Sequence, residues 1–317
     1  MKAVAIDRGG KAEELVGRVL CHDIRDRSQH IVFRKGHALG ADDVPVLMEG
    51  SLEEIHLLEL GADDVGQRQA GERLARILSS AGAQSAPAGH RHVLKAVHKG
   101  LLRIDVAALQ RLNSIAGIAV FTLRDDHVVS ADQVVAEAQI TGLAIERRFI
   151  DAVEEIVRES AGVLRVRPFV PRDAIVWMRD DRLHRELTDK LRWFDCRVRE
   201  IVDLPRDASS IRQAMEQRGE SGATLFLVSG SNALDPLDPI FSALDEMGAT
   251  MHRLGLPVHP GTLLWIASRE SITILGLPTC GLGAQLTAFD LILPRLLAEG
   301  GIRDEDLAGL GHGGILR

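Results

Sequence analysis

The most regular hydrophobic pattern lies in residues 168–317, where short apolar runs alternate with segments of helical spacing. The apolar runs predict buried strands over 174–178, 197–202 and 224–228. Apolar positions spaced three or four residues apart predict helices over 183–194, 211–215 and 240–247. Strands that alternate with helices form parallel sheets covered on both faces. We therefore predict a doubly wound, mostly parallel α/β domain over 168–317.

The rhythm changes towards the end of this region. The apolar segments 263–268 and 271–275 are separated by the polar residues 269–270, which predicts a hairpin. A last helix is predicted from the apolar side formed by Leu286, Phe289, Ile292, Leu293 and Leu296. The glycine-rich segment 276–285 therefore joins a strand to a helix.

The first half of the chain mixes helix and strand patterns less regularly. Helical spacing at 41–50 and 63–80 surrounds a strand-like run at 54–60. Residues 79–92 are rich in Ser, Ala, Gly and Pro and lack periodicity, which predicts a linker. Beyond it, the patterns predict strands over 117–123 and 138–145 and helices over 105–115 and 149–162. We expect three domains: a mixed α/β region at 1–80, a β-rich module with a connecting helix at 81–167, and the α/β domain at 168–317.

The composition is that of an ordinary globular protein. Apolar residues make up 45% and charged residues 26% of the 317 residues, while aromatic residues make up only 3%, so the cores must be mainly aliphatic. The formal charge of −7 argues against a nucleic-acid partner, which needs a basic face. No apolar run is long enough to span a membrane, and the three cysteines are too far apart for a disulfide framework. We therefore expect a cytoplasmic protein with neither a nucleic-acid nor a membrane partner.

Two loops in the C-terminal half join a predicted strand to a helix. They are SGSNALDPLD at 229–238 and GLPTCGLGAQ at 276–285, and the turn VHPGTL at 258–263 lies between them in the sequence. In open parallel sheets, ligands bind beyond the carboxyl ends of the strands, where backbone amides and helix N-termini converge. Several glycines let the backbone approach an anion, namely Gly230, Gly276, Gly281 and Gly283. The loops together predict a pocket for a small anionic molecule.

Each loop taken alone also fits an ordinary connection between strand and helix. Asp235 would then cap a helix that begins near Pro236. Neither a dinucleotide-binding glycine fingerprint nor a phosphate-binding P-loop follows any predicted strand. His252 and His259 are interpreted as loop residues rather than as bases for a serine nucleophile. The sequence therefore favours anion binding over covalent catalysis.

Three short motifs carry a resemblance to a known family. Residues 229–238 are similar to the pattern T-G-G-x-S-x-G-D-x-D, HPGTL at 259–263 to a K-P-G-K-P turn, and GLPTCG at 276–281 to a G-L-P-G-N-P loop. These patterns belong to molybdopterin-binding proteins of the MoeA/gephyrin and MogA/MoaB type. The strongest overall likeness is to the molybdopterin-binding half of bacterial fusion proteins that also carry a molybdenum cofactor cytidylyltransferase half.

The resemblance implies a small anionic pterin ligand, molybdopterin or the molybdenum cofactor, in a MogA/MoaB-like domain at 168–317. The binding residues that it implies are Ser229, Gly230, Ser231, Asn232, Asp238, Pro260, Gly261, Gly276, Pro278, Thr279 and Gly281. Asp235 and Asp238 are the candidate catalytic carboxylates and the candidate ligands of a Mg²⁺ ion. By analogy with the family we also expect a homodimer, and a molybdoenzyme or a nucleotidyltransferase as partner.

The sequence also departs from this family. It lacks the S-A-M-D-G-Y-A motif of MoeA, and His259 and Thr262 replace the two lysines of K-P-G-K-P. Three hypotheses stay open. The chain is a carrier or maturation protein that binds the pterin, a molybdenumtransferase or nucleotidyl-transfer enzyme that uses Asp235 and Asp238, or a non-catalytic interaction module for molybdoenzyme maturation.

Overall fold

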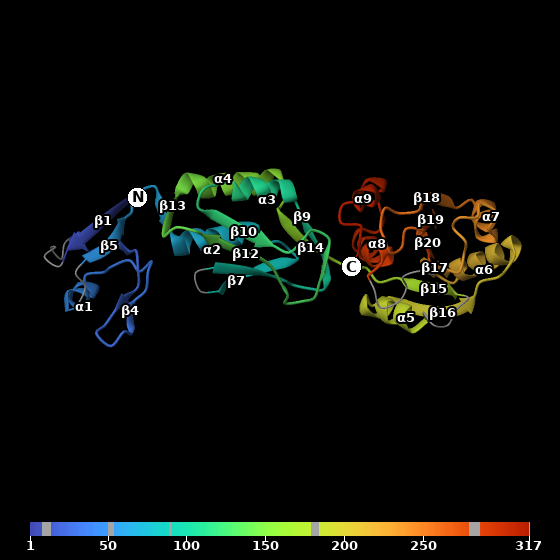
Figure 1. Ribbon diagram of the computed structural model, residues 1–317, viewed down its shortest axis with the longest axis horizontal. Coiled ribbons are helices and arrows are strands. Elements are labelled where there is room, and N and C mark those ends of the chain that lie inside the picture. Colours follow the sequence, from blue (N-terminus) through green and yellow to red (C-terminus); the bar gives the residue numbers. More distant parts are fainter. Residues whose placement is uncertain (8–13, 50–53, 89–90, 179–183, 279–285, 317) are drawn as a thin grey trace. The chain divides into compact units, whose positions relative to one another are not determined.

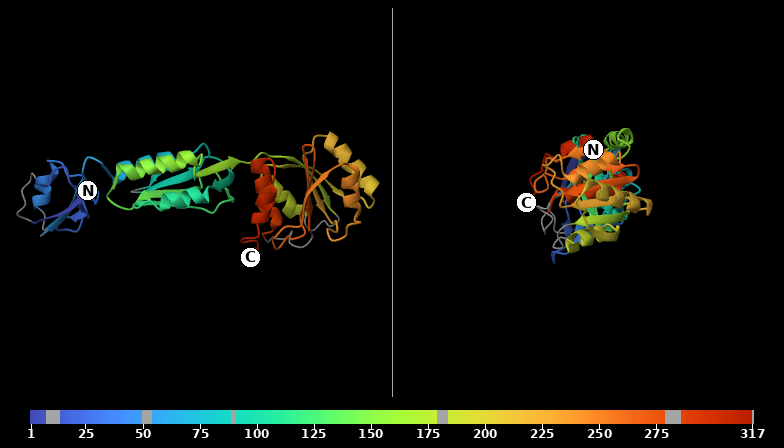
Figure 2. Two further views of the ribbon diagram at one scale, coloured as in Figure 1. Left: turned by 90° about the horizontal axis from the view of Figure 1, so that it is seen from above. Right: turned by 90° about the vertical axis from the view of Figure 1, so that its right-hand side faces the viewer.

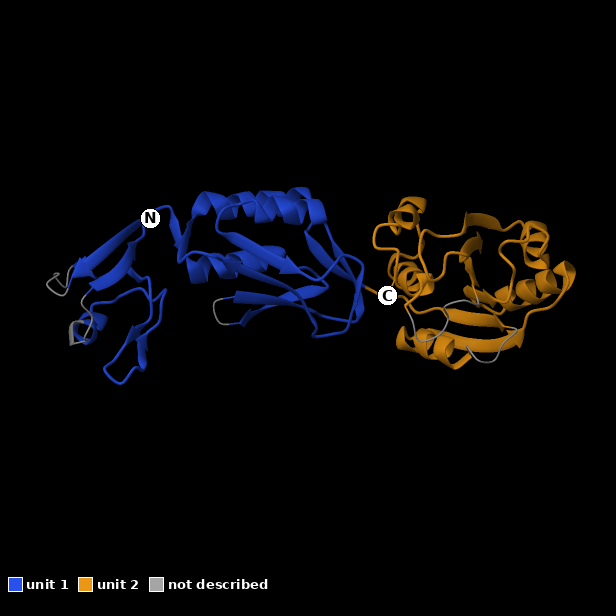
Figure 3. Cartoon of the chain, viewed as in Figure 1, with its two compact units in different colours: residues 1–167 blue, residues 168–317 orange. Residues whose placement is uncertain are grey.

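The computed structural model describes residues 1–7, 14–49, 54–88, 91–178, 184–278 and 286–316 (Figure 1, with further views in Figure 2). The chain divides into two units, Met1–Arg167 and Pro168–Arg317 (Figure 3). Helices and sheets occur in both units, which confirms the expected α/β class. No helix within the described ranges is both long enough and apolar enough to cross a membrane.

The N-terminal part of unit 1 forms a small antiparallel sheet, a hairpin and a helix. Its elements are β1 (Lys2–Asp7), β2 (Val19–Leu20), β3 (Ile24–Arg25), β4 (Ile31–Phe33), α1 (Asp43–Glu49) and β5 (Glu54–Glu59). β1 and β2 both pair with β5, and β3 pairs with β4. Buried aliphatic side chains join this sheet to α1, among them Leu20, Leu57, Val44 and Leu47. The helix expected at 41–50 and the strand expected at 54–60 are confirmed.

The rest of unit 1 is a second α/β body with its own core. Its elements are β6 (Asp64–Gly66), α2 (Gln67–Leu78), β7 (Ala83–Ala88), β8 (Arg91–Ala96), β9 (Gly100–Ile104), α3 (Val106–Asn113), β10 (Ile118–Thr122), β11 (His127–Val129), β12 (Val134–Ile140), β13 (Ala144–Glu146), α4 (Arg147–Glu159) and β14 (Leu164–Pro168). The strands form sheets in the orders β10-β12-β8-β7, β11-β9-β14 and β13-β6. Leu74 of α2 and Leu94 of β8 belong to one buried cluster, so the division expected at residue 80 falls inside this core.

The segment 79–92 was expected to be a linker, and this prediction was wrong. Residues 83–88 form β7, which pairs antiparallel with β8. The small residues have a packing reason, because a Cβ on Gly82 would lie 2.2 Å from the carbonyl oxygen of Val166. Backbone pairing and close approach determine this strand, and neither produces a hydrophobic period.

Unit 2 is a six-stranded sheet with helices on both faces (Figure 2). Its elements are β15 (Asp173–Met178), α5 (His184–Trp193), β16 (Arg197–Asp203), α6 (Ala208–Glu220), β17 (Leu225–Ser229), α7 (Pro239–Glu246), β18 (Thr250–Leu254), β19 (Trp265–Arg269), β20 (Ile272–Leu277), α8 (Ala288–Glu299) and α9 (Asp304–Gly309). The strand order is β16-β15-β17-β20-β19-β18. The first four strands are parallel, whereas β19 and β18 run antiparallel to their neighbours.

The central strands bury both of their faces, which explains their continuous apolar runs. Val176 of β15 and Leu227 of β17 share a cluster with Leu187 of α5 and Phe289 of α8. Trp177 and Phe226, which neighbour them in sequence, point to the opposite face. There they share a cluster with Ile211 of α6 and Leu244 of α7. Helices that cover both faces leave the carboxyl ends of the parallel strands as the open edge of the sheet.

The structure adds two features to the predicted pattern of unit 2. β18 was missed because most of its side chains are exposed on an edge strand, so it has no apolar run. The expected hairpin is confirmed as β19 and β20, but β20 also pairs in parallel with β17. This second pairing places the end of the hairpin beside the end of β17.

Candidate functional site

A hollow of about 260 Å³ lies at the carboxyl ends of β17 and β20. Eight residues from three segments line it: Gly230, Ser231, Asn232, Ala233, Leu263, Trp265, Leu277 and Pro278. Ser229 pairs with Leu277 where the two parallel strands end, so the loops that follow leave the sheet side by side. The structure thus brings the end of β20 and the loop at 229–238 to one place.

The residues expected to bind a ligand occupy different positions around this hollow. Gly230, Ser231, Asn232 and Pro278 line it. Ser229 and Gly276 belong to the strands β17 and β20, and Pro260 and Gly261 belong to the turn whose Leu263 lines the hollow. Thr279 and Gly281 lie outside the described residues.

Asp238 determines the shape of the loop at 229–238. It is 8% exposed, and its Oδ2 accepts the backbone N–H of Asn232 at 2.7 Å while its Oδ1 accepts that of Ile240 at 3.1 Å. Asp238 is therefore the N-cap of α7, whose first residue is Pro239. The expectation that Asp235 caps a helix near Pro236 was wrong, because Asp235 instead accepts the N–H of Leu237 within the loop, at 2.9 Å.

These contacts bear on the two candidate carboxylates. Both oxygens of Asp238 already accept backbone N–H groups, and Asp235 lies on an exposed turn. In the part of the chain that the structure describes, no group of three or more His, Cys, Asp or Glu side chains could hold a metal ion. The geometry favours a loop-shaping role for Asp238.

Four of the eight lining residues were not among those expected to bind a ligand: Ala233, Leu263, Leu277 and Trp265. The most consequential of these is Trp265. It pairs with Gly276 across β19 and β20, and a Cβ on Gly276 would lie only 1.8 Å from its Cε2 atom. The indole ring therefore lies directly against the backbone of β20. Its Nε1 donates to Ser231 Oγ at 3.3 Å, and its ring meets Phe241 edge-on at 5.7 Å between centroids. A glycine inside a strand marks such close approach, but Gly276 was expected in the loop after the strand predicted at 271–275, whereas the structure places it within β20.

Pro260 and Gly261 anchor the turn that precedes β19. Pro260 O accepts the backbone N–H of Ala288 at 3.0 Å, at the first residue of α8. Gly261 has a φ of 110°, and a Cβ there would lie 2.6 Å from Ala288 Cβ. The two residues thus fix the turn to α8 and thereby position Leu263 at the hollow.

The eight lining residues of the hollow are uncharged, and two carboxylates at the starts of helices in unit 2 have partners of their own. Asp290, in the first turn of α8, accepts the N–H of Thr287 at 2.8 Å and pairs with Lys190 at 2.6 Å. At the start of α6, the Ser209 hydroxyl and the backbone N–H of Ser210 donate to Asp207 and lower the pKa of its carboxyl to about 2. Among these eight lining residues, an anionic ligand would find only neutral donors.

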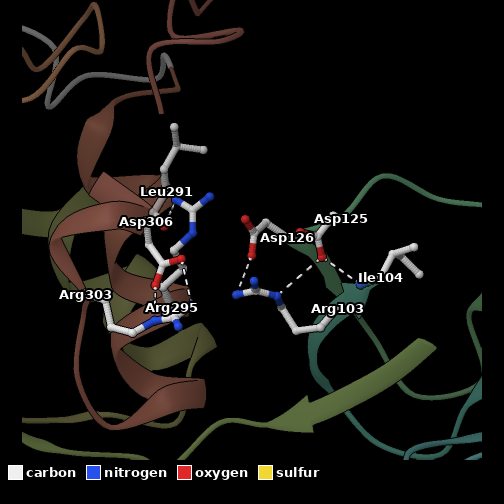
Figure 4. Close-up of polar contacts among 8 residues, drawn as sticks. All are labelled: Arg103, Ile104, Asp125, Asp126, Leu291, Arg295, Arg303 and Asp306. Carbon is white, nitrogen blue, oxygen red and sulfur yellow. Dashed lines mark hydrogen bonds and ion pairs between the residues drawn. The ribbon is translucent and has the colours of Figure 1, made fainter. Parts of the chain in front are cut away.

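Arginine–carboxylate pairs elsewhere serve the structure of each unit (Figure 4). In unit 1, Arg103 pairs with Asp125 at 3.3 Å and with Asp126 at 3.1 Å. In unit 2, Arg303 binds both oxygens of Asp306, at 2.9 and 3.0 Å. Two-pronged pairing of this kind orders side chains locally.

Comparisons with known proteins give the following. A family model described as "Domain of unknown function (DUF8806)" matches residues 11–59. No curated protein matches the chain. Among solved structures, the molybdopterin biosynthesis MoeA protein from Pyrococcus horikosii is 13% identical, with 95% of this chain and 76% of that protein aligned at a TM-score of 0.32. A molybdenum cofactor biosynthesis protein from Pyrococcus furiosus is 12% identical, with 97% and 65% aligned at a TM-score of 0.27. TM-scores of this size do not establish a common fold.

Proposed function

We propose that this chain binds molybdopterin, or a precursor of the molybdenum cofactor, as a carrier or maturation protein. The binding site is the hollow at the carboxyl ends of β17 and β20. One observation carries the proposal: two segments whose sequences resemble molybdopterin-binding motifs contribute to a single hollow, through Ser231 and Asn232 on one side and Pro278 on the other.

The size and chemistry of the hollow suit one end of such a ligand. Its volume of about 260 Å³ is slightly below the roughly 300–1,000 Å³ of sites that hold a whole small ligand. Ser231 and Asn232 provide polar groups for an anionic end, and Leu263, Trp265 and Leu277 provide an apolar wall. Each hydrogen bond to a charged group contributes about 1.5–3 kcal/mol, so three or four of them offset the cost of ordering and give micromolar binding.

The same contacts favour binding over catalysis. A carrier needs only to hold its ligand, whereas molybdenum or nucleotidyl transfer would need carboxylates free to bind a metal ion. Asp238 uses both oxygens to hold the loop and the start of α7. Its part in the proposed function is to keep Ser231 and Asn232 in place.

The variant Asn232→Asp tests the proposal. The new side chain has the same shape and keeps an oxygen for the N–H of Leu234, which Asn232 Oδ1 accepts at 3.2 Å. It adds a negative charge at the hollow, and two like charges about 6 Å apart repel by roughly 1.4 kcal/mol at an effective dielectric constant of about 40. We expect molybdopterin affinity to fall about tenfold.

The matched control is Gln213→Glu, which adds the same charge to the exposed face of α6 in the same unit. The full chain is titrated with molybdopterin without oxygen, and pterin fluorescence reports binding. Equal affinities for the wild type and both variants would place the ligand elsewhere. A wild-type chain that binds no molybdopterin at tens of micromolar would refute the proposed function.

A further inference from the structure

The hydrogen bond between Trp265 and Ser231 has a fixed direction. An indole Nε1–H can only donate, and a buried indole normally finds an acceptor. Trp265 is fully buried, and its Nε1 lies 3.3 Å from Ser231 Oγ, so this oxygen accepts. No acceptor among the described residues takes the hydroxyl proton of Ser231. That proton is therefore available to a molecule in the hollow.

Asn232 likewise has a hydrogen-bond donor left for a molecule in the hollow. Its Oδ1 accepts the backbone N–H of Leu234, which assigns the oxygen end of the amide to the loop and leaves the Nδ2 group as a donor. The nearby carboxylate of Asp238 accepts from Asn232 N and Ile240 N. Each of the two polar side chains that line the hollow thus uses one oxygen lone pair within the protein, and its donor group has no acceptor among the described residues.

The position of the indole is determined by the core. On one side it lies against Gly276, where even a single added carbon would come within 1.8 Å of the ring. Phe241 of α7 meets the ring edge-on, and Trp265 belongs to the buried cluster formed by α6, α7 and the sheet. The donor in this bond therefore keeps its place whether or not a ligand is bound.

We infer that Trp265 is a positioning residue that sets the specificity of the hollow. Because its N–H takes one of the two lone pairs of Ser231 Oγ and leaves the hydroxyl proton for a ligand, the hollow favours a group rich in acceptors, such as a phosphate or another oxyanion, over ammonium, guanidinium and amide donors. The identity of the complete ligand rests on the proposed function, whereas this polarity follows from the hollow itself. In molybdopterin the selected group is the phosphate and not the N–H donors of the pterin ring.

The test uses the full chain with inorganic phosphate and, separately, methylguanidinium chloride at equal ionic strength. The chain has three tryptophans, and the indole N–H signal of Trp265 in a nitrogen-15 NMR spectrum is identified by its loss in Trp265→Phe. We expect phosphate to shift this signal saturably in the wild type and to leave it unmoved in Ser231→Ala. A saturable shift with methylguanidinium, or none with phosphate, overturns the inference.

Affinities for phosphate in single and double variants separate positioning from a merely structural role. We expect Ser231→Ala to weaken binding about tenfold and Trp265→Phe about threefold, with no further loss when Trp265→Phe is added to Ser231→Ala. The control is Trp177→Phe, which changes another buried tryptophan of the same unit and leaves phosphate affinity unchanged. If Trp265→Phe weakens phosphate binding by the same factor in the wild type and in Ser231→Ala, the ring only supports the fold and the inference is overturned.

The inference and the proposed function fail in different ways. Phosphate that binds with the expected dependence on Ser231 and Trp265, while molybdopterin does not bind, supports the inference and refutes the function. Molybdopterin that binds equally well with and without its phosphate group, and equally well in Ser231→Ala, refutes the inference and leaves the function standing.

Discussion

Replacing Gly276 by alanine should displace the indole ring that forms one wall of the hollow. The added Cβ would lie 1.8 Å from Trp265 Cε2 and 2.0 Å from Nε1, whereas ordinary contact begins at 3.4 Å. The ring must therefore move by about 1.6 Å, the difference between 3.4 and 1.8 Å, within a core where Trp265 is fully buried. Overpacking of this kind costs about 1–3 kcal/mol, and we expect the upper end because a whole ring has to move.

Urea unfolding of the full chain measures this cost. All three tryptophans, Trp177, Trp193 and Trp265, belong to unit 2, so tryptophan fluorescence reports the unfolding of that unit. The matched control is Gly301→Ala, because a Cβ there meets no atom within 4 Å. We expect Gly276→Ala to lower the free energy of unfolding of unit 2 by about 3 kcal/mol and Gly301→Ala to change it by less than about 0.5 kcal/mol.

A double variant identifies the cause of the loss. If the clash with the indole is responsible, Gly276→Ala should cost less than about 1 kcal/mol when Trp265 has already been replaced by alanine. Equal stability of Gly276→Ala and Gly301→Ala in the wild-type background would refute the reasoning, as would an undiminished cost of Gly276→Ala in the absence of the indole.

Two further predictions concern carboxylates that cap helices. Asp238→Ala should lower the free energy of unfolding of unit 2 by about 2 kcal/mol, because α7 loses its cap and Asn232 N–H loses its acceptor. Asp238→Asn should lower it by less. Urea unfolding measures both variants, and an unchanged free energy of unfolding in Asp238→Ala would contradict the role assigned to this residue. The pKa of Asp207 is lowered to about 2, chiefly by the Ser209 hydroxyl, so its charged form stabilises the fold above the ordinary value of 3.8 and this contribution is lost as the pH falls towards 2. The stability difference between the wild type and Asp207→Asn should therefore be constant above about pH 4 and shrink between 3.8 and 2, and a difference that stays constant across this range would argue against the shift.

The alternation of strands and helices in unit 2 could be predicted because the central strands are buried on both faces. β15 and β17 appear in the sequence as uninterrupted apolar runs, and the helices between them bury single stripes. β7 and β18 could not be predicted in this way. β7 (AQSAPA) has no large apolar side chain and follows Gly82, which lies close to the backbone of Val166, and β18 lies at an edge with exposed side chains.

The candidate site was predictable only as far as local sequence determines it. The loop after β17 was expected to lie at a strand end, and the structure places it there. The contact between Trp265 and Gly276 depends on the register between β19 and β20, which no local pattern contains. The choice of Asp238 over Asp235 as the N-cap depends on which of two similar Asp-Pro pairs begins the helix, and the two look alike in the sequence.

The pterin content of the purified chain tests the central claim most directly. The chain is produced in cells that make molybdopterin, and bound pterin is released, oxidised and measured by fluorescence per mole of protein. Leu263→Trp adds bulk to the lining of the hollow, and Leu234→Trp makes the same change at a neighbouring loop residue that is 72% exposed and does not line it. We predict pterin in the wild type and in Leu234→Trp, and little in Leu263→Trp. Equal pterin in a folded Leu263→Trp, or none in the wild type, would contradict the account.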